Sequence, residues 1–128
     1  MIHGHTFHVK SLSAFRLSAA LAFVGVVLGA FGAHALQERL TAFDTVKIWS
    51  TASLYHLVHS VALLVISRDY AVYKMAWWSF FVGVLIFSGS LYLLAVTDIR
   101  WLGAITPLGG LGFLLGWGSL VFNRAAKD

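Results

Sequence analysis

Four long stretches without a charged residue alternate with short segments that hold the charges. The stretches are residues 17–36, 48–66, 75–96 and 102–122. Each is long enough to cross a hydrocarbon layer of about 30 Å as a helix that rises 1.5 Å per residue. The pattern predicts an all-α membrane protein with four transmembrane helices in one bundle.

The charged residues lie in the breaks between these stretches. The three connections carry Glu38, Arg39, Asp44 and Lys47, then Arg68, Asp69 and Lys74, then Asp98 and Arg100. The connections are too short to hold a soluble domain. We therefore expect an amino-terminal tail at 1–15 and one transmembrane domain at 16–128.

Composition supports a membrane protein and excludes several other classes. Of 128 residues, 59% are hydrophobic and 11% are charged, against about 25% charged in a soluble domain. This excludes a soluble enzyme and a disordered tail. The charged residues behind the net charge of +4 lie singly between apolar runs. The expected partner is therefore the lipid bilayer, and no nucleic-acid partner is expected. The absence of cysteine excludes disulfides and thiolate metal ligands.

The first stretch has an alternative interpretation. Lys10 and Arg16, an apolar run and Ala33-His34-Ala35 together also fit a signal peptide with its cleavage site. The length and the glycine content of the run favour a membrane helix.

Basic residues near the ends of the stretches predict the orientation. The amino-terminal tail, the second connection and the carboxyl tail hold six Lys and Arg, whereas the other side holds three. Because cytoplasmic loops carry the excess of basic residues, both termini are expected in the cytoplasm, with the protein in the inner (plasma) membrane. Aromatic residues are expected at the interfaces, with Tyr70, Tyr73, Trp77 and Trp78 at the inner one and Trp49 and Trp101 at the outer one.

Small residues gather on one face of several stretches. Gly25 and Gly29 form a G-x-x-x-G pair, and Gly112 lies on a similar face of the fourth stretch. Such faces let helices approach closely in lipid. We expect packing within one chain, with a dimer interface as the alternative. Leucine at Gly29 or Gly112 should disrupt the bundle. Leucine at Val61 should not, because Val61 lies on an outward face where lipid can accommodate the larger side chain.

Polar residues inside the stretches define a candidate intramembrane site. Its members are His34, Tyr55, His56, His59, Ser60, Ser88, Ser90 and Thr106. His59 lies about 16 Å from the outer end of its stretch, near the midplane, where ionisable groups usually face the protein interior. We therefore expect His59 to point into the bundle and to form hydrogen bonds there. His3, His5 and His8 are expected in a solvated or interfacial tail.

Three chemistries are conceivable for these histidines. A metal site would have two ligands in His56 and His59 but no buried carboxylate or thiol to complete it. A haem would need two histidines at one depth, and His34 and His59 lie at different depths. A proton-coupled exporter would need an intramembrane carboxylate. No metal and no cofactor are therefore expected.

Thr106-Pro107 begins the fourth stretch. Proline fits the first turn of a helix, so a helix start near Pro107 is the simpler interpretation. A broken helix that lines a binding site is the alternative.

Four ordered blocks carry a resemblance to a known family. They are residues 28–34 (LGAFGAH), Tyr55 with His59, residues 87–95 (FSGSLYLLA), and residues 105–110 (ITPLGG) with Gly116-Trp117. In these blocks the sequence resembles the YgdD-like family of small inner-membrane proteins of unknown function. The resemblance implies a multi-pass four-helix protein and no particular reaction, substrate or cofactor.

Two functions follow as hypotheses. The first is a non-enzymatic helical bundle that assembles with itself or with another membrane protein. The alternative is a binder or carrier of a small molecule or ion, with a polar pocket around His59. An enzyme is not expected, because the stretches offer no set of nucleophile, base and orienting acid.

Overall fold

The protein folds entirely into helices. The computed structural model describes residues 2–124, with side chains from residue 10 onward. Over that range the elements, none of them a strand, are α1 (Ile2–Ala33), α2 (Gln37–Ala42), α3 (Val46–Ser67), α4 (Tyr70–Thr97), the 3-10 turn η1 (Arg100–Ala104) and α5 (Thr106–Val121). The segments long and apolar enough to cross a membrane are Lys10–Ala33, Val46–Ser67, Tyr70–Thr97 and Arg100–Val121. The predicted all-α class with four membrane-spanning helices is confirmed.

The first helix is longer than the apolar stretch that predicts it. Its backbone is helical from Ile2, so residues 2–15 of the segment expected as a tail (1–15) are continuous with the first membrane helix. The helix ends at Ala33 rather than at residue 36, and α2 follows after a short turn. The side chains of His3, His5 and His8 lie outside the described residues.

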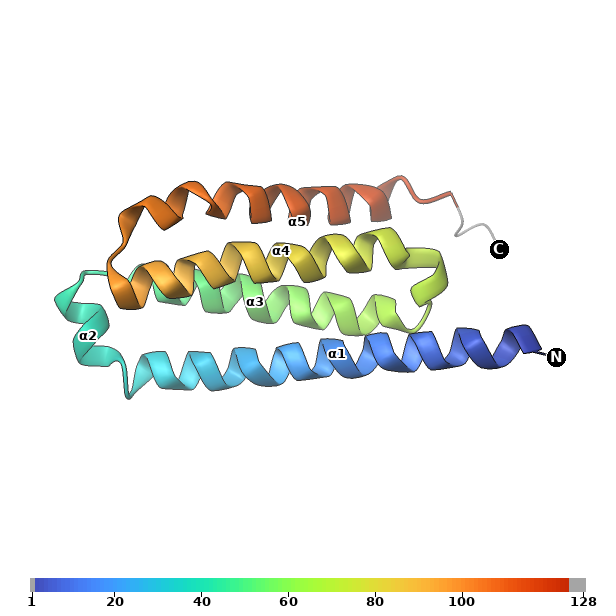
Figure 1. Cartoon of the computed structure of the whole chain (residues 1–128), viewed down its shortest axis with the longest axis horizontal. Coiled ribbons are helices and arrows are strands. Elements are labelled where there is room, and N and C mark those ends of the chain that lie inside the picture. Colours follow the sequence, from blue (N-terminus) through green and yellow to red (C-terminus); the bar gives the residue numbers. More distant parts are fainter. Residues whose placement is uncertain (1, 125–128) are drawn as a thin grey trace.

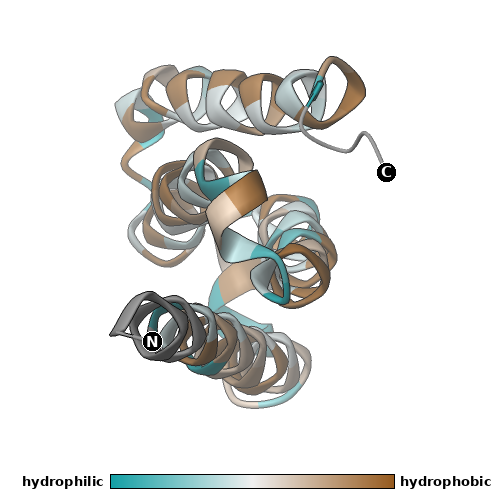
Figure 2. Cartoon of the chain, turned by 90° about the vertical axis from the view of Figure 1, so that its right-hand side faces the viewer, coloured by the Kyte–Doolittle hydropathy of each residue, from teal (hydrophilic) through white to brown (hydrophobic). Residues whose placement is uncertain are grey.

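The long helices lie side by side in a row (Figure 1). α1 packs on α3, α3 on α4 and α4 on α5, whereas α1 touches α4 only lightly and, within residues 2–124, does not contact α5. Viewed from the end, the row is a zigzag (Figure 2). The predicted bundle is therefore open, with α3 and α4 at its centre and α1 and α5 on its two flanks.

Glycines bring α4 and α5 into close contact. A Cβ on Gly109 would collide with the backbone of Phe87, and a Cβ on Gly112 would lie 3.1 Å from the backbone oxygen of Ser79. No side chain fits between the two helices at these levels. The prediction that Gly112 lies on a close-contact face is confirmed.

Gly29 differs from the prediction. Within 4 Å of a Cβ built there the structure places no atom, whereas a Cβ on Gly25 would lie 2.8 Å from Leu57. The space beside Gly29 is a groove of about 420 Å³ that Ser50 and Ser53 line from α3. Because these serine side chains are short, the helices leave a gap, and the expectation of close packing at Gly29 is wrong. Val61, in contrast, is 56% exposed, as its outward face predicts.

Two of the tryptophans expected at the interfaces are core residues instead. Trp77 and Trp49 are only 1% and 6% exposed. The indole Nε1–H of Trp77 donates to the hydroxyl of Ser18 at 3.1 Å, and that of Trp49 donates to the carbonyl of Leu28 at 3.0 Å. Both acceptors lie on α1, so these indoles hold the first helix against its neighbours. Trp78 and Trp101 are exposed, in keeping with the interfacial expectation.

The fourth helix starts as the simpler interpretation predicts. α5 begins at Thr106 with Pro107 in its first turn, where proline needs no hydrogen-bond acceptor. The preceding residues form η1, which completes the membrane-crossing length that α5 alone lacks.

At the end of the long helices opposite the termini, polar side chains fasten α2 and the connection between α2 and α3 to α4. Thr45 is fully buried and donates to the carbonyl of Ala95 at 2.7 Å. Arg39 donates to the carbonyl of Val96 at 2.7 Å. These contacts give the last carbonyls of α4 partners that the helix itself cannot supply.

Candidate functional site

His59 lies in the middle of α3 and uses both ring nitrogens in hydrogen bonds. Nδ1 lies 2.8 Å from the carbonyl oxygen of Tyr55, so Nδ1 carries the proton and donates it. Nε2 is then the acceptor for the indole Nε1–H of Trp117 on α5, at 3.0 Å. The ring of Phe113 stacks on the imidazole with centroids 3.7 Å apart. At 4% exposure His59 is a neutral, paired side chain inside the row, as predicted.

His56 lies one turn earlier on α3 and links a different pair of helices. Its Nε2 donates to the carbonyl of Leu21 on α1 at 2.8 Å. Its Nδ1 accepts the hydroxyl proton of Tyr92 on α4 at 3.0 Å. His56 therefore connects α3 to α1 and α4, whereas His59 connects α3 to α5. Together the two imidazoles fasten both flanking helices to the centre of the row.

The hydroxyl-bearing members of the predicted site are also paired. Ser60 donates to the carbonyl of His56 at 2.7 Å, within α3. Ser88 on α4 donates to the carbonyl of Ala52 on α3 at 2.8 Å. The hydroxyls of Ser90 and Thr106 lie 2.6 Å apart and join α4 to the start of α5. Among the described residues, no buried side-chain nitrogen or oxygen lacks a partner.

The predicted residues therefore form several separate contacts rather than one pocket. His56 on α3 binds groups of α1 and α4, and Ser88 on α4 binds the backbone of α3. His59 faces α5, and Ser90 with Thr106 forms its own pair. His34 joins none of them. It follows the last residue of α1, and its side chain is exposed.

A groove opens beside His59 toward the surrounding lipid. Its volume is about 480 Å³, and its lining combines aromatic rings with the first turns of α5: Tyr55, His59, Phe87, Pro107, Gly110, Leu111, Phe113, Leu114 and Trp117. Tyr55 is 40% exposed, and its ring lies 4.7 Å from that of Phe87. The Tyr55 hydroxyl has no hydrogen-bond partner among the described residues. This hydroxyl is the one polar group of the groove that the protein leaves free to bind something else.

Sequence reasoning missed the aromatic partners of the histidines. Trp117, Phe113 and Tyr92 complete the two histidine contacts, yet they lie in apolar stretches where they resemble ordinary core residues. One signal was available. A tryptophan or tyrosine in the middle of a membrane span carries an N–H or O–H that must find an acceptor, and the histidines were the best acceptors in the sequence.

The arrangement offers little to metal or acid–base chemistry. No group of three or more His, Cys, Asp or Glu side chains in the described part of the chain could hold a metal ion. Each imidazole would have to give up a hydrogen bond to bind a ligand or take up a second proton. Chemically, the site can hold helices together and can offer an aromatic, lipid-facing surface.

These features define a multi-pass helical membrane protein with an internally paired polar interior. The chain belongs to the family described as protein of unknown function DUF423, which matches residues 28–110. The matched range contains both histidines of α3 and ends in the first turns of α5. Trp117, the partner of His59, lies beyond it.

Relatives that are named as membrane proteins point to the same class. The chain is 44% identical over 112 residues to the UPF0382 membrane protein SSP2132 of Staphylococcus saprophyticus, which covers 84% of this chain and 92% of the relative. It is 41% identical over 107 residues to the UPF0382 membrane protein YwdK of Bacillus subtilis, covering 79% of this chain and 86% of the relative. No solved structure matches. This is a membrane protein of an uncharacterised family.

Proposed function

We propose that the protein is non-enzymatic and acts through lateral contacts within the bilayer, with itself or with another membrane protein. The observation that carries this proposal is the pairing of His56 and His59, whose four ring nitrogens all bind groups of the protein. A general base, a proton relay or a metal ligand needs a free nitrogen facing a substrate or a water-filled path. These imidazoles instead maintain an open helix row, which leaves two flanking helices available to neighbours.

Disulfide crosslinking tests this proposal directly, because the chain contains no cysteine. Single cysteines replace Phe23 on α1 and Leu114 on α5, each 71% exposed, and the variants are oxidised in intact membranes. The expected result is a discrete disulfide-linked product from at least one flank. Ala52→Cys, at a position with no exposure, is the internal control and should yield none. Absence of any discrete product from both flanks would contradict the proposal.

We infer that the protein lies in the inner (plasma) membrane with both termini in the cytoplasm. The start of α1 and the end of α5 lie at the same end of the row (Figure 1). That end carries Lys10, Arg16, Arg68, Lys74 and Arg124, and the opposite end carries Arg39, Lys47 and Arg100. The excess of basic residues supports a cytoplasmic location for the termini.

We also propose that the YgdD-like proteins belong to the same family as the relatives described above. The support is the position of the shared blocks. Three of them, the LGAFGAH segment, Tyr55 with His59, and the segment from Phe87 to Ala95, lie inside the matched range 28–110. Pairwise alignment of a YgdD-like sequence with YwdK through these blocks tests the assignment.

The groove beside His59 supports a second candidate function, the binding of a lipophilic small molecule. The observation that favours it is that Tyr55, whose hydroxyl has no hydrogen-bond partner among the described residues, lines the groove. Tyr55 lies about 14 Å along α3 from Val46, near the middle of the span. A hydroxyl without a partner at this depth is costly, so a ligand that brings a hydrogen-bond acceptor would be favoured there. Native mass spectrometry of the protein in detergent should detect a retained small molecule if this second function is correct.

A further inference from the structure

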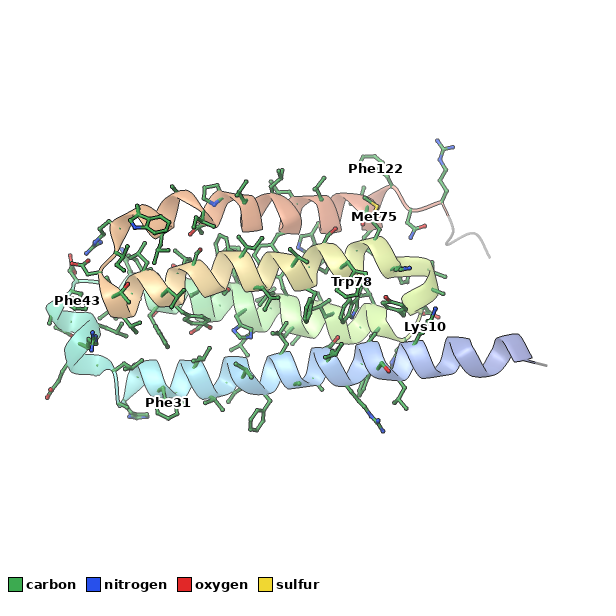
Figure 3. All side chains as sticks on the ribbon, viewed as in Figure 1. Lys10, Phe31, Phe43, Met75, Trp78 and Phe122 are labelled. Atoms are coloured by element: carbon green, nitrogen blue, oxygen red, sulfur yellow. The ribbon has the colours of Figure 1, made fainter. Side chains whose placement is uncertain are left out.

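At the end of the long helices where the termini lie, the structure contains a pocket that is separate from the histidine contacts. It lies between residues 10–17 of α1 and the start of α4 and has a volume of about 270 Å³. Its lining residues are Lys10, Ser13, Ala14, Leu17, Tyr70, Lys74, Trp77 and Trp78. A neighbouring pocket of about 250 Å³ shares Lys10, Tyr70 and Lys74, so the two form one basic recess. Figure 3 shows Lys10 and Trp78 at this end, on α1 and α4.

The recess presents several hydrogen-bond donors without a counter-charge. Neither Lys10 nor Lys74 forms an ion pair, since the one ion pair within the described residues joins Arg100 to Asp98 at the other end. The hydroxyl of Tyr70 accepts the indole N–H of Trp78 at 2.8 Å, which leaves its own proton free to be donated. Asp69, the nearest acidic residue in the sequence, does not line the recess. Two lysines and a tyrosine therefore line the recess, and among the described residues no acidic side chain lines it with them.

The remaining walls match the boundary between headgroups and acyl chains. Ala14 and Trp77 are buried at the base, whereas Leu17 and Trp78 are 49% and 46% exposed and continue the surface toward the hydrocarbon layer. Lysine side chains at the end of a membrane helix extend their ammonium groups to the headgroup level. A phosphate held by the lysines would leave its attached acyl chains against Leu17 and Trp78. This continuity favours a lipid over a free phosphate ion.

We propose that the recess between α1 and α4 binds the phosphate of an anionic phospholipid, with Lys10, Lys74 and Tyr70 as its donors. This site is independent of the function proposed above, because it shares no residue with the histidine contacts or with the groove beside them. The lysines supply charge attraction, and the Tyr70 hydroxyl adds a hydrogen bond of fixed direction.

The test measures lipid binding by native mass spectrometry. The full chain in detergent is titrated with short-chain phosphatidylglycerol, and phosphatidylcholine serves as the zwitterionic comparison. The expected result is one saturable phosphatidylglycerol site and weaker binding of phosphatidylcholine. Lys10→Gln and Lys74→Gln should each weaken binding about fivefold and the double variant about 30-fold, given the usual contribution of a lysine at an anionic surface. Lys74→Arg should retain most of the binding.

Arg68→Gln is the matched control, because it removes one positive charge from the same end of the protein at a residue that does not line the recess. Binding by this variant should be nearly unchanged. A loss as large as that of Lys74→Gln would mean diffuse charge attraction and would overturn the proposal. Displacement of the lipid by inorganic phosphate at a similar concentration would likewise overturn it, because the site would then recognise the free ion. Unchanged circular dichroism of each variant excludes misfolding as the cause.

Discussion

The indole of Trp117 on α5 donates a hydrogen bond to Nε2 of His59 on α3, across a distance of 3.0 Å. α3 and α5 are not neighbours in the row, since α4 lies between them. The tryptophan side chain is long enough to bridge the gap, and Phe113 fills the space beside the imidazole. The contact therefore ties a flanking helix to the central pair without direct packing of the two backbones.

We predict that His59 and Trp117 are energetically coupled. His59→Leu leaves the indole N–H without an acceptor, and Trp117→Phe leaves Nε2 without a donor, so each single variant should be destabilised. The loss of unfolding free energy in the double variant should be smaller than the sum of the losses in the two single variants. The difference should be about 0.6 kcal/mol and at most about 1.7 kcal/mol, as found for hydrogen bonds between membrane helices. Reversible unfolding from bicelles with dodecyl sulfate measures the four free energies of unfolding.

A second cycle provides the control for this coupling. Trp101 is 66% exposed at the opposite end from the termini and has no contact with His59. Trp101→Phe should therefore be additive with His59→Leu. Additivity in both cycles would contradict the assigned hydrogen bond.

Two glycines of α5 should respond differently to the same substitution. At Gly109 a Cβ collides with the backbone of Phe87, whereas at Gly118 no atom lies within 4 Å of it. Gly109→Ala should lower the free energy of unfolding by about 1–3 kcal/mol, the usual cost of forcing extra volume into a packed contact. Gly118→Ala should be neutral or slightly stabilising, because alanine favours the helix. Equal unfolding free energies for the two variants would show that the α4–α5 contact is looser than described.

The Tyr55 hydroxyl should control ligand retention in the groove. Tyr55→Phe keeps the ring, and therefore its contacts with Phe87 and Phe113, but removes the free donor. If the groove binds a small molecule, this variant should retain less of it in native mass spectrometry without losing stability. Tyr73→Phe removes a hydroxyl near the start of α4, at a residue that does not line the groove, and should leave ligand retention unchanged. Equal retention by the wild type and both variants would remove Tyr55 from the binding site.

The orientation can be tested with accessibility at the two ends. Reporter fusions after Lys74 and at the carboxyl end should both report a cytoplasmic location. Single cysteines are also placed at Lys74 and at Lys47, and a membrane-impermeant maleimide is added to intact cells. The cysteine at position 47 should be labelled and the cysteine at position 74 should not. An extracytoplasmic carboxyl end would contradict the inferred orientation.

The sequence by itself determined the class of the protein and its four membrane-spanning helices. Charges cannot lie in the hydrocarbon layer without a large cost, so their absence from four long stretches specifies where the helices cross. The same reasoning placed His59 inside the protein, because an imidazole near the midplane needs partners. Val61 and Gly112 were assigned to their faces by helical periodicity alone.

The tertiary structure decided which polar groups meet and how the helices are ordered. Periodicity gives the direction of a side chain on its own helix but not the identity of the neighbour that it faces. For that reason His34, His59 and Thr106 looked compatible with one site, although they lie in separate contacts or, for His34, at the surface. Gly29 and Trp77 show the same limit, since a small residue packs closely only where its neighbour reaches it, and an interfacial indole is buried only where an acceptor such as Ser18 lies opposite. The open row depends on these pairings, because in lipid the apolar surface of a helix does not by itself select a partner.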